Sequence, residues 1–216
     1  MPFGETELDR SSVVFIDEYA KRKQCRWYDE DRIPDLSIIQ DALQQTYDSV
    51  ASKQNLMPYK VYVIANRPDI NKQLYSWSTG STGTVTANTN LLSAPYQFIY
   101  TARLATDISD KVRADIDESK HLQPPCDPML YKSIGNLPAT CIEIGMHVTI
   151  LSKLLIEQGL DVAYTRCLDF SQVENSLDFI EDEPHFAMSA GYAASDRYEL
   201  SGETKPPIGN VHQIIE

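Results

Sequence analysis

The sequence predicts an α+β fold, in which helices pack around a central β-sheet. Apolar runs rich in β-branched and aromatic residues are typical of strands, and they lie at 60–65, 94–102 and 186–190. One long stretch, 137–158, is apolar on almost every side and is followed by Gly159, which indicates a buried helix with a glycine stop. A chain of 216 residues, 42% apolar and 23% charged, can bury one core, so we predict a single domain over 1–216.

Three further helices precede the long one, and they are predicted at 11–23, 35–47 and 69–77. Ser11 or Ser12 can cap the first of them. Pro34 at the first helical position, with Asp35 beside it, suits the start of the second. The third follows Pro68.

The remaining segments are strands, loops or unassigned. Residues 161–167 predict a further strand, and 78–90 predicts a loop because Ser, Thr, Gly and Asn dominate it. A linker between two domains is the alternative for 78–90. Alternating charges and prolines leave 104–132 as a lid or a helical excursion, and 206–216 is expected to form a C-terminal arm.

Composition excludes several classes of function. The formal net charge of −12 argues against a nucleic-acid-binding face, since neutralising phosphates needs surplus Lys and Arg. No apolar run approaches the ~20 residues that span a bilayer, so we expect no membrane segment. The polar, acidic N-terminus lacks a signal-peptide core, and we expect a cytoplasmic location. The scattered cysteines and histidines predict reduced thiols and no metal site.

Two polar segments flank the predicted helix over 35–47. The first, 22–28, brings together cations and an amide, namely Arg22, Lys23, Gln24 and Arg26. Two arginines four residues apart can converge on a phosphate. The second, 51–59, places small polar residues before a strand. A solvated basic helix end and a polar loop are the alternative interpretations.

The order of these segments resembles the FMN-dependent nitroreductase family. That family opens with an Arg/Lys, Ser, Arg/Lys cluster and an aromatic residue, followed by a helix and a Pro-Ser-x-x-Asn-x-Gln-Pro-Trp segment. In the second half of this chain, the matching features are Gly159-Leu160-Asp161, Gly191-Tyr192 and Lys205-Pro206-Pro207. The resemblance implies a three-layer fold with a mixed sheet of about four or five strands, in an intertwined homodimer.

The resemblance also implies cofactor-binding residues. The FMN phosphate would be held by Arg22 and Arg26, with Lys23, Gln24 and Lys205. The flavin ring edge and ribityl chain would be bound by residues of a partner subunit and of the polar loop: Ala51, Ser52, Lys53, Asn55, Asn88 and Asn90. Arg166 and Cys167 would lie at the turn that meets the flavin, where many members have Glu and Gly.

The resemblance implies an FMN-dependent oxidoreductase that passes hydride from NADH or NADPH to a small electron-poor acceptor. No side chain is predicted to be catalytic, because the flavin performs the chemistry. The departures at Arg166 and Cys167 leave two alternatives open. One is a flavin-binding or cofactor-free protein without turnover, and the other is a different flavin reaction, such as dehydrogenation or reductive dehalogenation.

Overall fold

The computed structural model describes residues 24–52, 57–78, 88–102 and 137–194, with the side chains from 139 onward in the last range. Its helices and strands are listed here in chain order: α2 (Leu36–Ser49), β1 (Tyr59–Ala65), α3 (Pro68–Ser76), α4 (Asn90–Ser93), β2 (Tyr96–Ala102), α6 (Leu137–Glu157), β3 (Asp161–Thr165), α7 (Phe170–Ser176) and β4 (Pro184–Gly191). The predicted helix at 11–23, the excursion at 104–132 and the arm at 206–216 lie outside the described residues.

The four strands form one sheet in the order β1-β2-β4-β3. All three strand pairings in the described part of the chain are antiparallel, so the mixed sheet that we expected is not seen there. The strand number and the α+β class are confirmed. β2 and β4 lie at the centre, and every residue of β2 is buried, as its continuous apolar sequence predicts.

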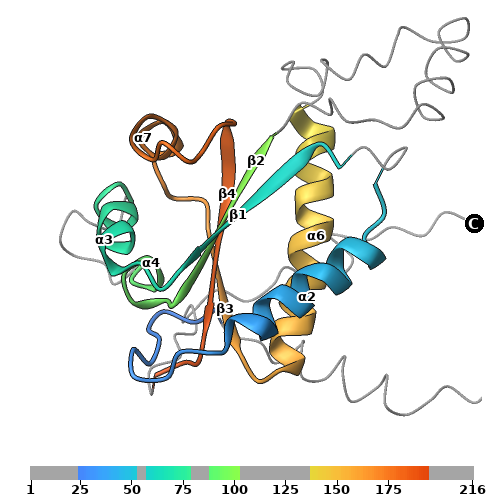
Figure 1. Ribbon diagram of the computed structural model, residues 1–216. Coiled ribbons are helices and arrows are strands. Elements are labelled where there is room, and N and C mark those ends of the chain that lie inside the picture. The colour runs from blue at the N-terminus through green and yellow to red at the C-terminus, as the bar shows by residue number, and fades with distance from the viewer. Residues whose placement is uncertain (1–23, 53–56, 79–87, 103–136, 195–216) are drawn as a thin grey trace, which may run out of the picture.

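The helices cover the sheet on both sides, which gives three layers (Figure 1). We call the side covered by α2 and α6 the helix-pair face and the side covered by α3, α4 and α7 the short-helix face. Alternate residues of β2 divide between them: Phe98 and Tyr100 pack on the helix-pair face, and Ile99 packs on the other. This period of two is what a strand buried on both sides requires.

Helix α6 is the main support of the helix-pair face. Leu151 and Leu155 are fully buried against the sheet, and Gly159 ends the helix at φ 77°, a left-handed conformation that glycine adopts without strain. By length and composition, 139–157 could also cross a membrane, which corrects our expectation that no segment qualifies. In this fold the helix packs on the sheet and on α2 instead.

Two aspartate caps explain differences at helix starts. Asp35 is the N-cap of α2, and its carboxylate accepts a hydrogen bond from the Ser37 amide at 2.8 Å, so Pro34 precedes the helix rather than opening it. Helix α7, which we did not predict, begins in the same way at Asp169. The four-residue α4 was also missed, within and just after the predicted loop.

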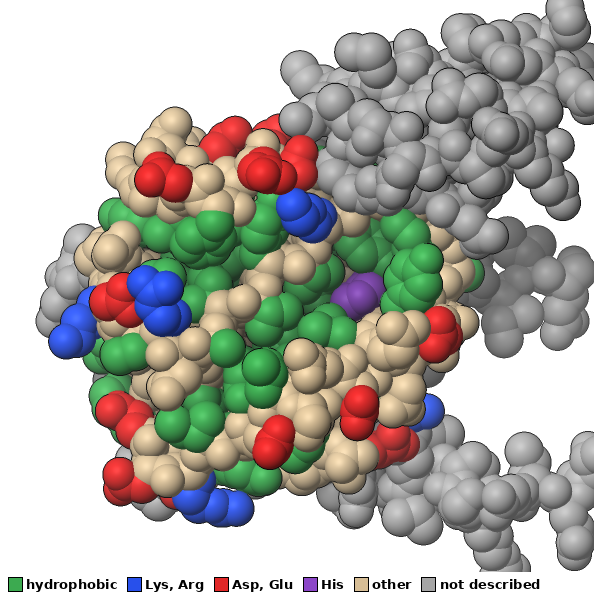
Figure 2. Space-filling model, in the orientation of Figure 1, with side chains coloured by type: hydrophobic (Ala, Val, Ile, Leu, Met, Phe, Trp, Pro, Cys, Tyr) green, Lys and Arg blue, Asp and Glu red, His purple; other side chains and the backbone are tan. Residues whose placement is uncertain are grey.

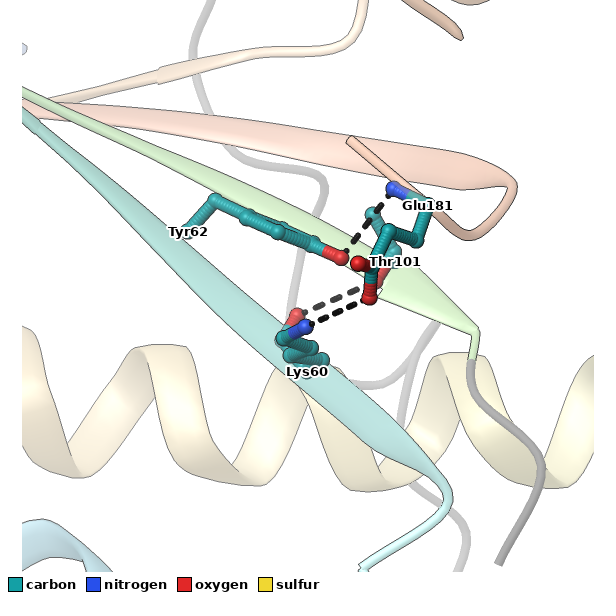
Figure 3. Close-up of polar contacts among 4 residues, drawn as sticks. All are labelled: Lys60, Tyr62, Thr101 and Glu181. Carbon is teal, nitrogen blue, oxygen red and sulfur yellow. Dashed lines mark hydrogen bonds and ion pairs between the residues drawn. The ribbon is translucent and has the colours of Figure 1, made fainter. Parts of the chain in front are cut away.

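Residues of the outer strand β1 form hydrogen bonds and an ion pair with the connection that leads into β4 (Figure 3). The Glu181 amide donates to the Tyr62 hydroxyl at 3.1 Å, and the Lys60 ammonium donates to the Glu181 carboxylate at 3.2 Å. The Lys60 ammonium also lies 4.5 Å from the centre of the Tyr62 ring. These exposed contacts order the chain at one end of the sheet.

The end of β4 is packed too closely for any side chain. A Cβ atom at Gly191 would lie 2.6 Å from the Pro95 Cδ atom and 2.9 Å from the Tyr28 Cδ1 atom. The Tyr28 ring is fully buried here, and its hydroxyl donates to the Ser189 carbonyl at 3.1 Å. Gly191 therefore lets the N-terminal segment close against the sheet.

Candidate functional site

The N-terminal segment runs along the outer edge of β3. The Cys25 amide donates to the Val162 carbonyl at 3.2 Å, and the Gln24 side-chain amide donates to the Tyr164 carbonyl at 2.7 Å. The Thr89 hydroxyl donates to the Arg26 carbonyl at 2.7 Å from the other side. Two of the predicted phosphate-binding residues, Gln24 and Arg26, are thereby fixed at this edge.

Arg166 and Cys167 directly follow β3, and both are exposed. The guanidinium carbon of Arg166 lies 5.4 Å from the centre of the Phe170 ring, within the range of a cation–π contact. Because Gln24 bonds to the backbone only two residues upstream, the structure brings Gln24, Arg166 and Cys167 into one neighbourhood.

An open pocket of about 190 Å³ lies between the first half of α6 and the adjoining ends of β3 and β4. Its lining consists of Cys141, Ile144, Gly145, Val148, Arg166, His185 and Phe186. Most of this surface is apolar, and the two basic side chains come from Arg166 and His185. We name it the Arg166–His185 pocket.

His185 is the buried polar group of this pocket. Its side chain is 8% exposed, and its Nε2 atom has no hydrogen-bond partner among the described residues. Its Nδ1 atom lies 4.0 Å from a Glu183 carboxylate oxygen. Burial lowers the pKa of His185 below its ordinary value, and the Arg166 charge lowers it further, while Glu183 and Glu174 act in the opposite direction.

The predicted ring-edge segment lies at the opposite side of the sheet. Ala51 is exposed, and the Ser52 hydroxyl accepts a hydrogen bond from the Met57 amide at 2.9 Å, just before β1. With β1 and β3 at the two outer positions, three strand spacings separate them, or roughly 14 Å. Within one chain, the segments at Gln24 and Ser52 therefore lie at opposite edges of the sheet.

Asn90, predicted as a cofactor contact, lies in the core of the chain. It is fully buried, and its side-chain amide donates to the Ser189 hydroxyl at 2.9 Å and to the Thr165 hydroxyl at 3.1 Å. The Ser189 hydroxyl in turn donates to the Gln97 side chain at 2.7 Å. Asn88 is also buried, with φ 70°, and occupies a left-handed turn that asparagine tolerates.

Five predicted site residues lie outside the described part of the chain: Arg22, Lys23, Lys53, Asn55 and Lys205. Conversely, sequence reasoning missed His185 and Cys141 as pocket residues. For His185, the expected strand began at 186, two residues after the start of β4 at Pro184, so the histidine was placed outside the sheet. The cross-strand pair Thr165 and Ala187 brings it beside Arg166, and no local pattern reveals that pairing.

A second pair of ionisable groups, one on α6 and one on β2, is buried between that helix and the sheet. The Tyr100 hydroxyl and the His147 Nδ1 atom are 3.2 Å apart, and the Tyr59 and His147 rings meet edge to face at 5.3 Å. Burial lowers the pKa of His147 to about 4 and raises that of Tyr100 well above its ordinary value. Both groups are therefore neutral at neutral pH, as a core site requires.

No protein-family model and no curated protein sequence matches the chain. Several solved structures, however, have a similar fold. A nitroreductase-like protein from Streptococcus mutans has a TM-score of 0.74 at 17% identity, over 95% of this chain and 100% of its own. A candidate NAD(P)H:FMN oxidoreductase from Staphylococcus epidermidis has a TM-score of 0.71 at 16% identity, over 98% and 100%.

A third structure is a candidate nitroreductase from Exiguobacterium sibiricum in complex with FMN. Its TM-score is 0.69 at 16% identity, over 99% of this chain and 100% of its own. These similarities span nearly the whole length of both chains in each comparison. The predicted resemblance is thus confirmed at the level of architecture, and the chain has the nitroreductase-like fold.

Proposed function

We propose that this protein is an FMN-dependent oxidoreductase of the nitroreductase type, which uses NADH or NADPH to reduce a small electron-poor molecule. One observation carries the proposal: the fold brings Gln24 and the turn of Arg166 and Cys167 together at the end of β3, where Arg166 lines an open pocket. The FMN complex among the structures with this fold supports the cofactor.

The described residues fit part of an FMN site. A guanidinium at Arg26 and an amide at Gln24 suit a phosphate or a polar chain. The apolar pocket wall and the open space at Gly145 suit one edge of a planar ring. When bound, FMN would supply the hydride chemistry, and the protein would supply position and charge.

Arg166 would place a positive charge beside the cofactor, where many nitroreductases have Glu. A cation there favours a negatively charged reduced ring. Because Arg166 is exposed, water screens much of this effect. Arg166→Glu should therefore lower the midpoint potential of bound FMN by a modest amount, which a potentiometric titration of both proteins measures.

We further propose that the active form is a homodimer. The Ser52 segment and the Gln24 segment lie at opposite edges of the sheet, so a second copy would have to bring one to the other. Helix α6 also exposes apolar side chains that a partner could cover, with Ile142 at 66% exposed and Met146 at 39%. Ile142→Asp should produce monomers in light scattering, and a flavin-loaded wild-type monomer would contradict the proposal.

The cofactor assignment is tested by FMN binding. A visible absorbance spectrum of the purified protein should show bound flavin. Arg26→Ala should weaken FMN binding by about 1.5–3 kcal/mol, the usual range for a charged hydrogen bond. Arg67→Ala is the matched control, since Arg67 is an exposed arginine that pairs with Asp69 at 2.7 Å away from this edge. Equal losses of affinity in both variants would refute the assignment.

A second candidate function is binding without turnover. It is favoured by Arg166 and Cys167, which replace the usual Glu and Gly at the turn after β3. A flavin spectrum without NADH or NADPH oxidation, tested with nitroaromatic and quinone acceptors, would support this alternative over the oxidoreductase.

A further inference from the structure

The guanidinium of Arg166 lies against an aromatic ring and not against a carboxylate. Its central carbon is 5.4 Å from the centre of the Phe170 ring, inside the ~6 Å range of cation–π attraction. Among the described residues Arg166 forms no ion pair. An exposed arginine side chain without a partner samples many rotamers. The Phe170 ring is therefore the contact that can restrain this charge.

Phe170 is itself held in place by its helix and by the core. It is the first residue of α7 and directly follows the N-cap residue, Asp169, whose carboxylate caps the helix. Its ring is partly buried and packs against the apolar cluster of the short-helix face, which includes Val173. The ring thus offers a fixed surface to Arg166, which follows the end of β3 and is exposed.

The same guanidinium belongs to the Arg166–His185 pocket. Arg166 lines this pocket, and its charge acts on the His185 ring there. The interaction between two charges weakens with distance and with screening by water and salt. The effect of Arg166 on the pocket therefore depends on where its guanidinium stays, and a residue that keeps it in one position sets the charge that the pocket experiences.

We propose that Phe170 is a positioning residue for Arg166: its ring holds the guanidinium at the wall of the pocket, so that the first turn of α7 sets the charge beside the proposed FMN site. Phe170 lines a separate hollow, beside Glu174 and Glu183. The inference rests on the proposed function for its consequence at the cofactor. The contact and its effect on His185 belong to the protein with or without flavin.

The pKa of His185 reports where the Arg166 charge stays. Burial lowers this pKa most, and the Arg166 charge lowers it further, while Glu183 and Glu174 act in the opposite direction. Removal or release of the Arg166 charge should therefore raise the pKa of His185. Proton NMR of the imidazole ring across pH, assigned with the His185→Gln variant, measures this pKa in the purified protein.

A double-mutant cycle tests whether Phe170 acts through Arg166. Arg166→Gln should raise the pKa of His185, and Phe170→Leu should reproduce the larger part of that shift, because leucine has no π face. Phe170→Trp, which keeps an aromatic face, should leave the pKa at its wild-type value. In the Arg166→Gln background, Phe170→Leu should cause no further shift, because the group that it positions is gone.

Val173→Ala is the matched control for a purely structural role. Val173 lies on the same helix and is fully buried in the same apolar cluster. Its truncation should lower stability in urea unfolding and leave the pKa of His185 unchanged. An equal pKa shift in Val173→Ala and Phe170→Leu would overturn the inference, and so would an unchanged pKa in Phe170→Leu.

A potentiometric titration of bound FMN separates this inference from the cofactor assignment. Phe170→Leu should lower the midpoint potential in the same direction as Arg166→Gln but by less, and the double variant should match Arg166→Gln alone. If the pKa of His185 responds as expected and the protein binds no flavin, the positioning role stands and the proposed function fails. If flavin binds and Phe170→Leu changes neither the pKa nor the midpoint, the positioning role fails and the proposed function stands.

Discussion

The two faces of the sheet bury different kinds of polar group. On the short-helix face three buried polar side chains, Asn90, Gln97 and Ser189, bond to one another, and all three are neutral. On the helix-pair face α6 buries ionisable groups, Glu143 and His147, and its outer side leaves apolar side chains exposed. The helix-pair face is the one whose stability should respond to pH and to a partner.

Hydrophobic side chains are exposed at the surface of the described residues. In one view, hydrophobic side chains occupy much of the middle, and acidic side chains lie toward the margins (Figure 2). Large exposed apolar side chains are found on both helices of the helix-pair face, at Leu36 and Tyr47 of α2 and at Ile142 of α6. Exposed apolar surface of this kind is typical of contact sites rather than of isolated domains.

Adjacent residues of β2 provide the strongest test of this comparison. Phe98 and Ile99 are both fully buried, one on each face. Phe98→Ala should cost about 3–5 kcal/mol of unfolding free energy, and Ile99→Ala about 2–5 kcal/mol. If only the helix-pair face meets a partner, the melting temperature of Phe98→Ala should depend more strongly on protein concentration. Equal concentration dependence, measured by calorimetry, would break the comparison.

Acid should destabilise the helix-pair face through His147. The pKa of this histidine is about 4 in the folded protein, below the ordinary value of 6.5, so the unfolded chain binds the proton more readily. The contribution of His147 to the free energy of unfolding is complete above about pH 6.5. It is lost as the pH falls toward 4, and it amounts to on the order of 3 kcal/mol. Urea unfolding across this range should show a steeper loss for the wild type than for His147→Gln. Parallel curves would contradict the assignment.

The neutral network of the short-helix face should respond to substitution and not to pH. Asn90→Ala removes the donor to the Ser189 and Thr165 hydroxyls and should cost about 1–3 kcal/mol in chemical denaturation. The cost should be the same at pH 5 and pH 7. If the protein binds FMN as proposed, the Asn90→Ala variant should bind it as the wild type does, since Asn90 is a core residue. A specific loss of FMN from a stable variant would restore its predicted role in the site.

The smallest expected effect is at the start of α7. The Asp169 carboxylate accepts hydrogen bonds from the Ser171 and Gln172 amides, at 3.1 and 3.2 Å. Asp169→Ala should therefore cost about 1 kcal/mol in urea unfolding, and Asp169→Asn, which can still accept, less than that. An equal cost for both variants would show that the charge, rather than the cap, matters.

Sequence patterns located the elements with strong local signals. Helix α6 was predicted to within one residue of its end, because its apolar run is continuous and Gly159 follows. Helix α7 was missed because only Val173 on it is buried, so no apolar period marks it. The His185 pocket position and the burial of Asn90 depend on which strands become neighbours. That information is carried by long-range pairing and is absent from any short window of sequence.

The close packing at Gly191 has a consequence for how this protein can vary in evolution. The Cβ atom of any side chain at this position would clash with the Pro95 ring and with the Tyr28 ring. A relative that replaces Gly191 must therefore also change both of those rings. In an alignment of distant relatives, these three positions should change together. A deep mutational scan should find position 191 intolerant in the wild-type background, and more permissive in one that carries both Tyr28→Ala and Pro95→Ala.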